Sequence, residues 1–227
     1  MALAGSGAVC IWNGIAPEGR DTFYDWHNHE HMPERAAIDG FLRGRRYIAA
    51  TPETAPEFFT VYETADVDVL TSAVYLARLN APTEWTRRAT AHFRDTSRAL
   101  TRVVASRGPG QGGLLASVRI LDTGAGQEGL ASVLRNASGI VDTIARMPQI
   151  TGAHICSTDT EASSGRTAES KSRTDIQTAP IGALLIEACN LDPLKVAVAG
   201  LAAVTGKPLA GAVIGYYRLE YECLKPR

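Results

Sequence analysis

The residues best suited to chemistry lie together near the N-terminus, in the segment Asp25–Arg35 with the sequence DWHNHEHMPER. Three of the five histidines of the chain fall within it. On a helix, His27 and His31 are one turn apart and share a face with Glu30, whereas His29 points away. Histidine titrates near neutral pH, and a neighbouring carboxylate can orient its ring. The pattern therefore predicts an acid–base group made of His31, His27 and Glu30.

The same segment also matches the H-x-x-E-H pattern of a class of zinc peptidases, from His27 to His31. That pattern is short, and Pro33 is expected to end or kink the helix directly after it. Only His92 and His154 are left as distant third ligands. We therefore expect no metal. Two interpretations stay open: substrate binding or proton transfer, and a structural role in which the histidines pin the following turn.

The elements that must position this segment occur twice in one order. Strand, helix, strand, strand, helix and strand patterns fill residues 7–106 and again residues 114–225, with a glycine-rich linker at 107–113. Helical spacing covers residues 17–37, 66–80, 83–94 and 130–146, and a further helix begins at 192. The predicted strands are Val9–Asn13, Phe41–Ala49, Phe58–Thr64, Ala99–Ala105, Leu114–Leu121, Ile150–Cys156, Ala183–Cys189 and Val213–Cys223.

This order predicts an α+β fold of two tandem ferredoxin-like (βαββαβ) halves. Each half would form a four-stranded antiparallel sheet with helices on one face. The bare faces must also be buried, and packing them sheet to sheet gives an α/β barrel within one chain, with a pocket between the sheets. The second half carries a polar insertion at residues 157–180, expected to be a mobile surface loop or a lid.

Strand alternation predicts which side chains enter that pocket. Phe41, Arg43, Arg45 and Tyr47 share one face of their strand. If helices cover the apolar faces, the residues that point into the barrel are Arg43, Arg45, Tyr47, Thr60 and Tyr62. His154 lies 109 residues after Arg45 and is expected to enter from the second sheet. The alternative is that the arginines lie at the rim with their charged ends in water.

A second cluster of aromatic and basic residues lies in the segment TEWTRRATAHFRD. Trp85 and His92 fall on one face of a helix there. They are candidates to close the pocket as substrate-binding residues, although a core or interface position is equally compatible with the spacing.

Three runs, WHNHEHMPERAAIDGFLRGRRYIA, FFTVYET and APTEWTRRATAHFRD, resemble a family of dimeric α/β-barrel proteins related to the EthD-like group. The resemblance covers about residues 8–105, and its most specific parts are Glu30–Glu34 and Gly40–Tyr47. It implies a ferredoxin-like fold with a pocket lined partly by these motifs. The wider superfamily includes cofactor-free monooxygenases, isomerases, lyases and haem-dependent enzymes, so the resemblance implies an architecture rather than one reaction.

The two halves differ at the histidine motif. The second half has Arg146 where the first has His31, each followed by Met-Pro. We therefore expect any chemistry to come from the first half alone.

These residues predict a cofactor-independent enzyme that acts on a small carbonyl or aromatic metabolite by proton transfer, as a lyase or isomerase does. His31 would move the proton, and Arg43 or Arg45 would bind a carboxylate or enolate. Tyr47, Tyr62 and Trp85 would form walls of the pocket. Two alternatives stay open: a monooxygenase that uses dioxygen, with or without haem, and a barrel that binds a metabolite without turnover.

Composition limits the partners. The net charge of −1 gives no electrostatic reason to expect nucleic acid or an anionic membrane. No apolar run approaches the roughly 20 residues that span a bilayer. The four cysteines are dispersed in apolar runs, as expected for a reduced, cytoplasmic protein. A small-molecule substrate is the expected partner, and homodimerisation is left open.

Overall fold

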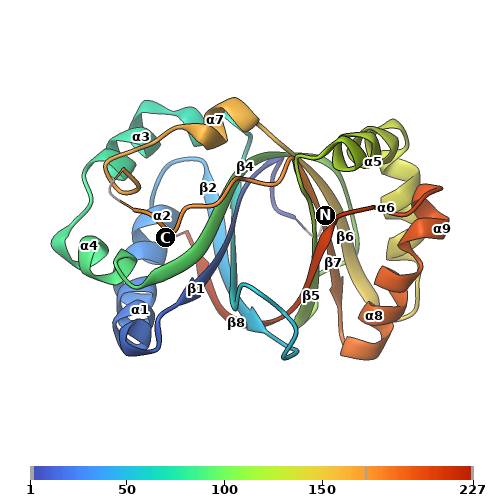
Figure 1. Cartoon of the computed structure of the whole chain (residues 1–227), viewed down its shortest axis with the longest axis horizontal. Coiled ribbons are helices and arrows are strands. Elements are labelled where there is room, and N and C mark those ends of the chain that lie inside the picture. Colours follow the sequence, from blue (N-terminus) through green and yellow to red (C-terminus); the bar gives the residue numbers. More distant parts are fainter. Residues whose placement is uncertain (1–2, 172, 226–227) are drawn as a thin grey trace.

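Eight antiparallel strands close into a barrel within residues 3–171 and 173–225, which the computed structural model describes (Figure 1). Their order around the barrel is β1-β3-β2-β8-β5-β7-β6-β4. The strands are β1 (Gly7–Ile15), β2 (Phe41–Ala49), β3 (Phe58–Thr64), β4 (Phe93–Arg107), β5 (Leu114–Ile120), β6 (Ile150–Thr158), β7 (Gly182–Ala188) and β8 (Val213–Leu224). Every strand predicted from the sequence is present, and β1, β4, β6 and β8 are longer than predicted.

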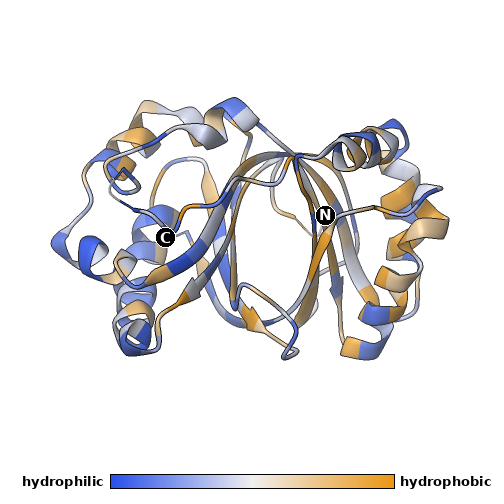
Figure 2. Ribbon diagram, viewed as in Figure 1, coloured by the Kyte–Doolittle hydropathy of each residue, from blue (hydrophilic) through white to orange (hydrophobic). Residues whose placement is uncertain are grey.

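The helices lie outside the barrel in two groups on opposite sides (Figure 1). One group consists of η1 (Pro17–Gly19), α1 (Arg20–Trp26), η2 (His27–His31), α2 (Met32–Ala36), η3 (Asp68–Thr71), α3 (Ala73–Asn80), α4 (Glu84–Thr90) and α7 (Thr160–Ser164). The other consists of α5 (Gly124–Arg135), α6 (Ala137–Ala145), α8 (Leu191–Ala199) and α9 (Leu201–Thr205). Figure 2 shows hydrophobic residues on the barrel strands and along the second group of helices. None of the helices in the described part of the chain has the length and hydropathy to cross a bilayer.

The histidine segment is one turn of π-helix inside a longer helix. The Met32 amide donates to the carbonyl of His27, five residues earlier, and Pro33 follows at once. The helix does not end at Pro33 but continues to Ala36, and the interruption expected near Pro33 takes the form of the π turn before it. Proline has no amide hydrogen, and its ring clashes with the carbonyl four residues earlier in an α-helix. The wider π turn before Pro33 accommodates the ring.

Buried side chains of the described residues pack the barrel interior, where the sequence predicts a pocket between two sheets. Trp12 and Phe59 stack at 5.2 Å between ring centroids, and the Trp12 indole donates to Ser117 Oγ at 3.0 Å. Apolar neighbours inside the barrel include Tyr47, Val61, Leu115, Cys156, Leu185 and Tyr217.

The predicted orientation of strand β3 is wrong. Phe59 and Val61 point into the barrel, whereas Thr60 and Tyr62 point toward the helices. Both faces of the sheet are buried, so hydrophobic alternation did not distinguish them. Phe41 also faces the helices, unlike Arg43, because a bulge between these two residues shifts the register.

The polar insertion packs against the first group of helices. After α7, residues 165–171 and 173–177, here termed the strap, run beside β4 and α3. The Thr96 amide donates to Asp175 O at 3.0 Å, and the Gln177 amide donates to Thr96 O at 2.7 Å. The Glu169 amide donates to Leu79 O at 3.0 Å. The strap therefore lies against β4 and the end of α3.

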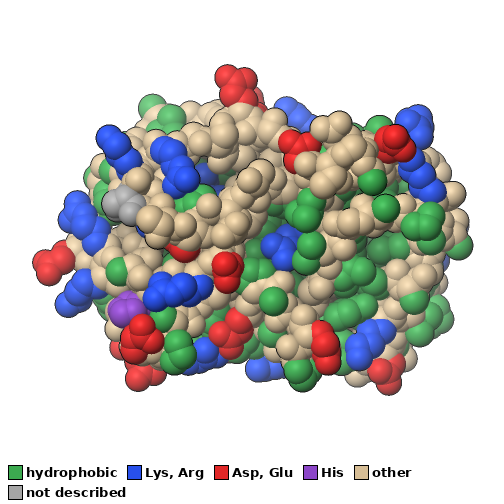
Figure 3. Space-filling model, in the orientation of Figure 1, with side chains coloured by type: hydrophobic (Ala, Val, Ile, Leu, Met, Phe, Trp, Pro, Cys, Tyr) green, Lys and Arg blue, Asp and Glu red, His purple; other side chains and the backbone are tan. Residues whose placement is uncertain are grey.

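Charged side chains of both signs are interspersed on the face of the molecule shown in Figure 3. This distribution agrees with the net charge of −1.

Candidate functional site

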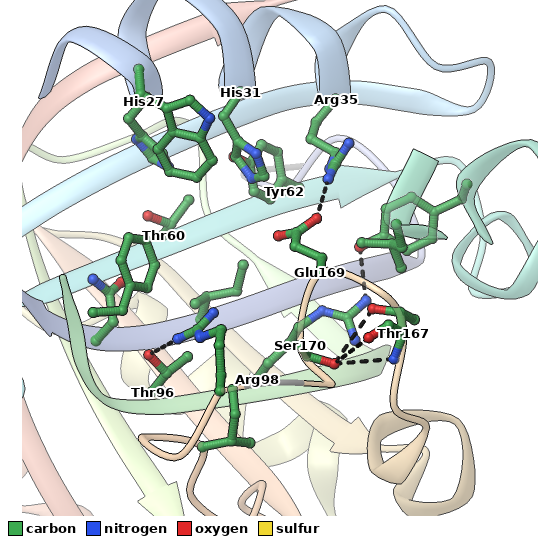
Figure 4. Close-up of a pocket in the computed structure, with 18 residues that line it drawn as sticks. His27, His31, Arg35, Thr60, Tyr62, Thr96, Arg98, Thr167, Glu169 and Ser170 are labelled. Carbon is green, nitrogen blue, oxygen red and sulfur yellow. Dashed lines mark hydrogen bonds and ion pairs between the residues drawn. The ribbon is translucent and has the colours of Figure 1, made fainter. Parts of the chain in front are cut away.

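A cavity of about 80 Å³ lies between the histidine helix, the outer face of the first four strands, and the strap (Figure 4). One ordered water needs roughly 10–15 Å³ of such space, so the cavity can hold several waters or the reacting part of a small molecule. Its polar lining comes from three sources, namely the helix (His27, His31, Arg35), the sheet (Thr60, Tyr62, Thr96, Arg98) and the strap (Thr167, Glu169, Ser170).

The π turn aligns the helix side chains of this cavity. Four residues advance slightly more than one turn of an α-helix but slightly less than one turn of a π-helix. From His27 to His31 the side-chain direction therefore turns slightly one way around the helix axis. From His31 to Arg35 it turns slightly back. All three side chains project from the same side of the helix toward the sheet (Figure 4).

His27 is held in one tautomer by an arginine from strand β2. Arg46 Nη1 lies 3.2 Å from His27 Nδ1 and 2.7 Å from Asn28 Oδ1. A guanidinium can only donate, so Nδ1 accepts and the ring proton resides on Nε2. Burial, together with the charge of Arg46, lowers the pKa of His27 well below its usual value. His27 is therefore neutral at physiological pH.

His31 is also buried and neutral, but its Nδ1 atom has no hydrogen-bond partner within the described residues. Its ring lies 4.3 Å from the ring of Trp26 and 5.5 Å from that of His27, centroid to centroid. Burial lowers the pKa of His31 well below its usual value, and the charge of Arg35 adds to the shift. A neutral imidazole that faces a cavity is suited to accept a proton or a hydrogen bond.

Tyr62 supplies a second polar group without a partner. Its hydroxyl is buried and makes no hydrogen bond with the described residues, and its ring meets that of His31 edge-on at 6.2 Å. Burial raises the pKa of Tyr62, so the hydroxyl stays protonated and can donate. Buried polar groups are rarely left unpaired, because each one costs roughly 1–3 kcal/mol. The unpaired His31 Nδ1 atom and Tyr62 hydroxyl therefore favour a bound oxygen-containing ligand or water.

Three arginines add positive charge to the cavity. Arg35 forms ion pairs with Glu34 at 3.0 Å and with Glu169 of the strap at 2.8 Å. Arg173 is paired with Asp175. Arg98 donates to the Tyr75 hydroxyl at 2.8 Å and has no ion pair with the described residues.

Four predicted site residues lie inside the barrel instead. Arg45 is fully buried and donates to Glu63 at 2.8 Å, to Glu187 at 2.9 Å and to the Tyr47 hydroxyl at 2.6 Å. Arg43 also donates to Glu63, at 2.7 Å. We call this group, with His154, the interior network. The structure separates all of these side chains from the cavity at the histidine helix.

His154 completes the interior network. Its Nε2 lies 3.5 Å from Glu187 Oε1, and its Nδ1 lies 2.8 Å from Ser106 Oγ. Burial alone would raise the pKa of Glu187, but His154 and the charge of Arg45 outweigh it and lower that pKa to about 2. Glu187 is therefore ionised, and Arg45 joins it to Glu63 across the barrel.

The remaining predicted site residues lie outside both regions. Glu30 accepts hydrogen bonds from Thr83 and Thr86 and so joins the histidine segment to the start of α4. Trp85 and His92 line a separate hollow on the outer side of α1 and α4. Neither Trp85 nor His92 lines the cavity at His31.

Sequence reasoning missed Arg35, Arg46, Arg98 and Glu169. Arg35 lies four residues after His31, so the helical spacing that pairs the histidines could have included it. Arg46 was on the face of its strand assigned to the helices, which is where His27 lies. Arg98 and Glu169 are far away in sequence, and no local pattern marks them.

The residues of this region do not form a metal site. Among the described residues, no group of three or more His, Cys, Asp or Glu side chains is placed to hold a metal ion. Glu30, the third member of the zinc-like pattern, points toward α4. The superfamily that the sequence resembles also includes haem enzymes. A cavity of about 80 Å³ does not fit a porphyrin, since pockets for drug-sized ligands measure roughly 300–1,000 Å³.

No protein-family model and no curated protein matches the sequence. Solved structures do match. An anthrone oxidase-like protein has a TM-score of 0.62 and 8% identity, covering 97% of this chain and 93% of its own. A protein provisionally called a monooxygenase, from Fusobacterium nucleatum subsp. nucleatum, has a TM-score of 0.57 and 10% identity, covering 98% and 96%. At such identities the likeness shows the fold alone, and the relation to the EthD-like group stays a prediction.

Proposed function

We propose that this chain is an enzyme that removes a proton from a small carbonyl or aromatic compound, with His31 as the base. The observation that carries the proposal is the pair of unpartnered buried groups at the cavity, His31 Nδ1 and the Tyr62 hydroxyl. One is an acceptor for a proton and the other is a donor to an oxygen. A substrate with an acidic C–H next to a carbonyl oxygen needs both.

The chemistry follows from the charge of each group. Neutral His31 takes the proton and becomes an imidazolium, while the Tyr62 hydroxyl donates to the carbonyl oxygen that gains negative charge. The imidazolium and the enolate form together, so their charges balance within the cavity. His27 stacks on His31 and is itself held by Arg46, which makes it a positioning residue. Returning the proton to another carbon gives isomerisation, and expelling a leaving group gives elimination.

A second candidate is oxidation by dioxygen on the same scaffold. The names of the two structural neighbours, anthrone oxidase-like protein and monooxygenase, favour it. The step begins with the same proton removal. A methylene carbon that loses its two hydrogens to one dioxygen and gains one oxygen atom becomes a carbonyl, with one water as the other product.

We also infer that the barrel consists of two ferredoxin-like halves, residues 7–106 and 114–225. The strand orders β4-β1-β3-β2 and β8-β5-β7-β6 support this division, because corresponding strands occupy corresponding places. The β2–β8 and β4–β6 pairs then join the halves. In this arrangement only the first half carries the histidine turn.

Hydrogen–deuterium exchange tests the proposed proton removal without knowledge of the later steps. Aryl ketones, 1,3-dicarbonyl compounds and anthrone are incubated with the protein in deuterated buffer, and loss of the C–H signal is followed by proton NMR. We expect the wild type to accelerate exchange for part of this panel. The His31→Ala variant should fall to the buffer rate, and the exposed neighbour variant His29→Ala should keep the wild-type rate.

Two outcomes would contradict the proposal: no acceleration of exchange for any compound, or wild-type exchange by His31→Ala. Oxygen uptake then decides between the two candidates. Consumption of one dioxygen per substrate supports the oxidation, whereas exchange without oxygen uptake supports isomerisation or elimination.

A further inference from the structure

We propose that the substrate carries a carboxylate and that Arg98 binds it, which makes Arg98 the specificity-determining residue of this site. The inference rests on the proposed function for the position of the reacting carbon. It goes beyond it by assigning the charge of the substrate and the direction in which the substrate extends.

Arg98 lies where two cavities meet. A second cavity, of about 310 Å³, lies on the other side of the strap. It shares three lining residues with the cavity at His31, namely Arg98, Ser170 and Ile176. Figure 4 shows Arg98 rising from β4 beside Ser170, below the row of helix side chains. Because Arg98 lines both cavities, a ligand in either one can reach this guanidinium.

Arg98 has no carboxylate partner among the described residues. Arg35 and Arg173, the other two arginines at the His31 cavity, are each paired with a carboxylate at 3.0 Å or less. Arg98 makes a hydrogen bond to the neutral Tyr75 hydroxyl and has no ion pair within the described residues. A guanidinium has five N–H donors, so most of them are free for an oxyanion.

The second cavity has the size and polarity to hold the rest of such a molecule. Its lining includes the hydroxyl side chains of Thr160, Ser163, Ser164 and Thr178. The charges of Asp122 and Arg166, which also line it, are of opposite sign. Arg98 is therefore the cation that faces both spaces, and a carboxylate there leaves the adjacent carbon free to extend toward His31 and Tyr62.

Direct binding of a matched pair of probes tests the inference. Benzoate and benzamide have nearly the same shape, but only benzoate is an anion. Isothermal titration calorimetry measures both with the wild type, with Arg98→Gln, and with Arg102→Gln. Arg102 is an exposed arginine on the same strand and lines neither cavity.

We expect the wild type to bind benzoate more tightly than benzamide. Arg98→Gln should weaken benzoate about 10- to 100-fold, the usual range for a charged hydrogen bond, and leave benzamide within about twofold. Arg102→Gln should change neither. Equal binding of the two probes by the wild type, or unchanged benzoate binding by Arg98→Gln, would overturn the inference.

The binding test and the exchange test fail independently. If exchange occurs but Arg98→Gln binds benzoate normally, the function stands and the assignment of Arg98 is wrong. If benzoate binding depends on Arg98 but no compound exchanges, the anion site stands and the proposed catalysis is wrong.

Discussion

At the scale of single residues, the site depends on buried polar groups that make no hydrogen bond within the fold. His27 has a partner that fixes its tautomer, whereas His31 Nδ1 and the Tyr62 hydroxyl have no hydrogen-bond partner among the described residues, and both residues line the cavity. A side chain kept only for stability would be expected to complete its hydrogen bonds inside the protein. The proposed binding role of the cavity rests on these two unpaired atoms lying in residues that line one cavity.

The neutrality of His31 makes stability depend on pH. Its pKa in the folded chain lies below the ordinary value of 6.5, so below that pH the unfolded chain binds a proton that the folded chain does not. This group should therefore lower the free energy of unfolding by up to about 1.4 kcal/mol for each unit by which the pH is lowered below 6.5. Urea unfolding between about pH 5 and about pH 7.5 should show a shallower slope for His31→Gln. A slope in His31→Gln equal to that of the wild type would contradict the shift.

A variant of Tyr62 tests whether its hydroxyl serves the function or the fold. The Tyr62→Phe variant removes a hydroxyl that has no partner among the described residues, so the free energy of unfolding should stay the same or rise by up to about 3 kcal/mol. The catalysed exchange rate should drop about 10- to 100-fold, because the donor to the substrate oxygen is lost. A large loss of stability with unchanged exchange would show that the hydroxyl serves the fold.

At the scale of elements, the strap is tied to the histidine helix through one ion pair. Glu169→Ala removes the Arg35–Glu169 bridge while the Arg35–Glu34 bridge remains, at a cost of about 1.5–3 kcal/mol to the closed strap. Amide hydrogen exchange of the strap should rise by about 10-fold or more. Glu161→Ala, an exposed acidic residue on α7, provides the control and should leave strap exchange unchanged. Unchanged exchange in Glu169→Ala would show that the backbone hydrogen bonds alone hold the strap.

The elements also show how far the sequence predicts this molecule. The strands and their order were predictable, since alternation and turn residues mark each one locally. The faces of β3 were not, because Phe59 and Tyr62 lie on opposite sides of a sheet that is buried on both. The π turn lies directly before Met32 and Pro33, and the spacing of residues along an ordinary α-helix does not predict it. The Arg35–Glu169 contact joins residues from different halves of the chain, so no local pattern could reveal it.

At the scale of the whole molecule, the interior network joins strands that are distant around the barrel. Arg45 on β2 binds Glu63 on β3 and Glu187 on β7. Arg45→Gln leaves buried carboxylates short of a partner, so it should lower the free energy of unfolding by about 3–5 kcal/mol. Arg218→Gln, an exposed arginine on β8, should change it by no more than about 0.5 kcal/mol.

A double-variant cycle measures the link between the two sides of the barrel. Because Arg45 and Glu187 are in contact, Arg45→Gln combined with Glu187→Gln should cost less than the sum of the single changes, by about 1–3 kcal/mol. Additive losses would mean that the contact contributes nothing to holding the barrel closed.

The central claim is that the chemistry belongs to the cavity at the histidine helix and not to the barrel interior. The most direct test compares His31→Gln with His154→Gln in the hydrogen–deuterium exchange assay, with rates corrected for the folded fraction. We expect the His31→Gln rate to fall to that of buffer and the His154→Gln rate to stay within about twofold of the wild type. Loss of exchange in His154→Gln with full exchange in His31→Gln would contradict the account.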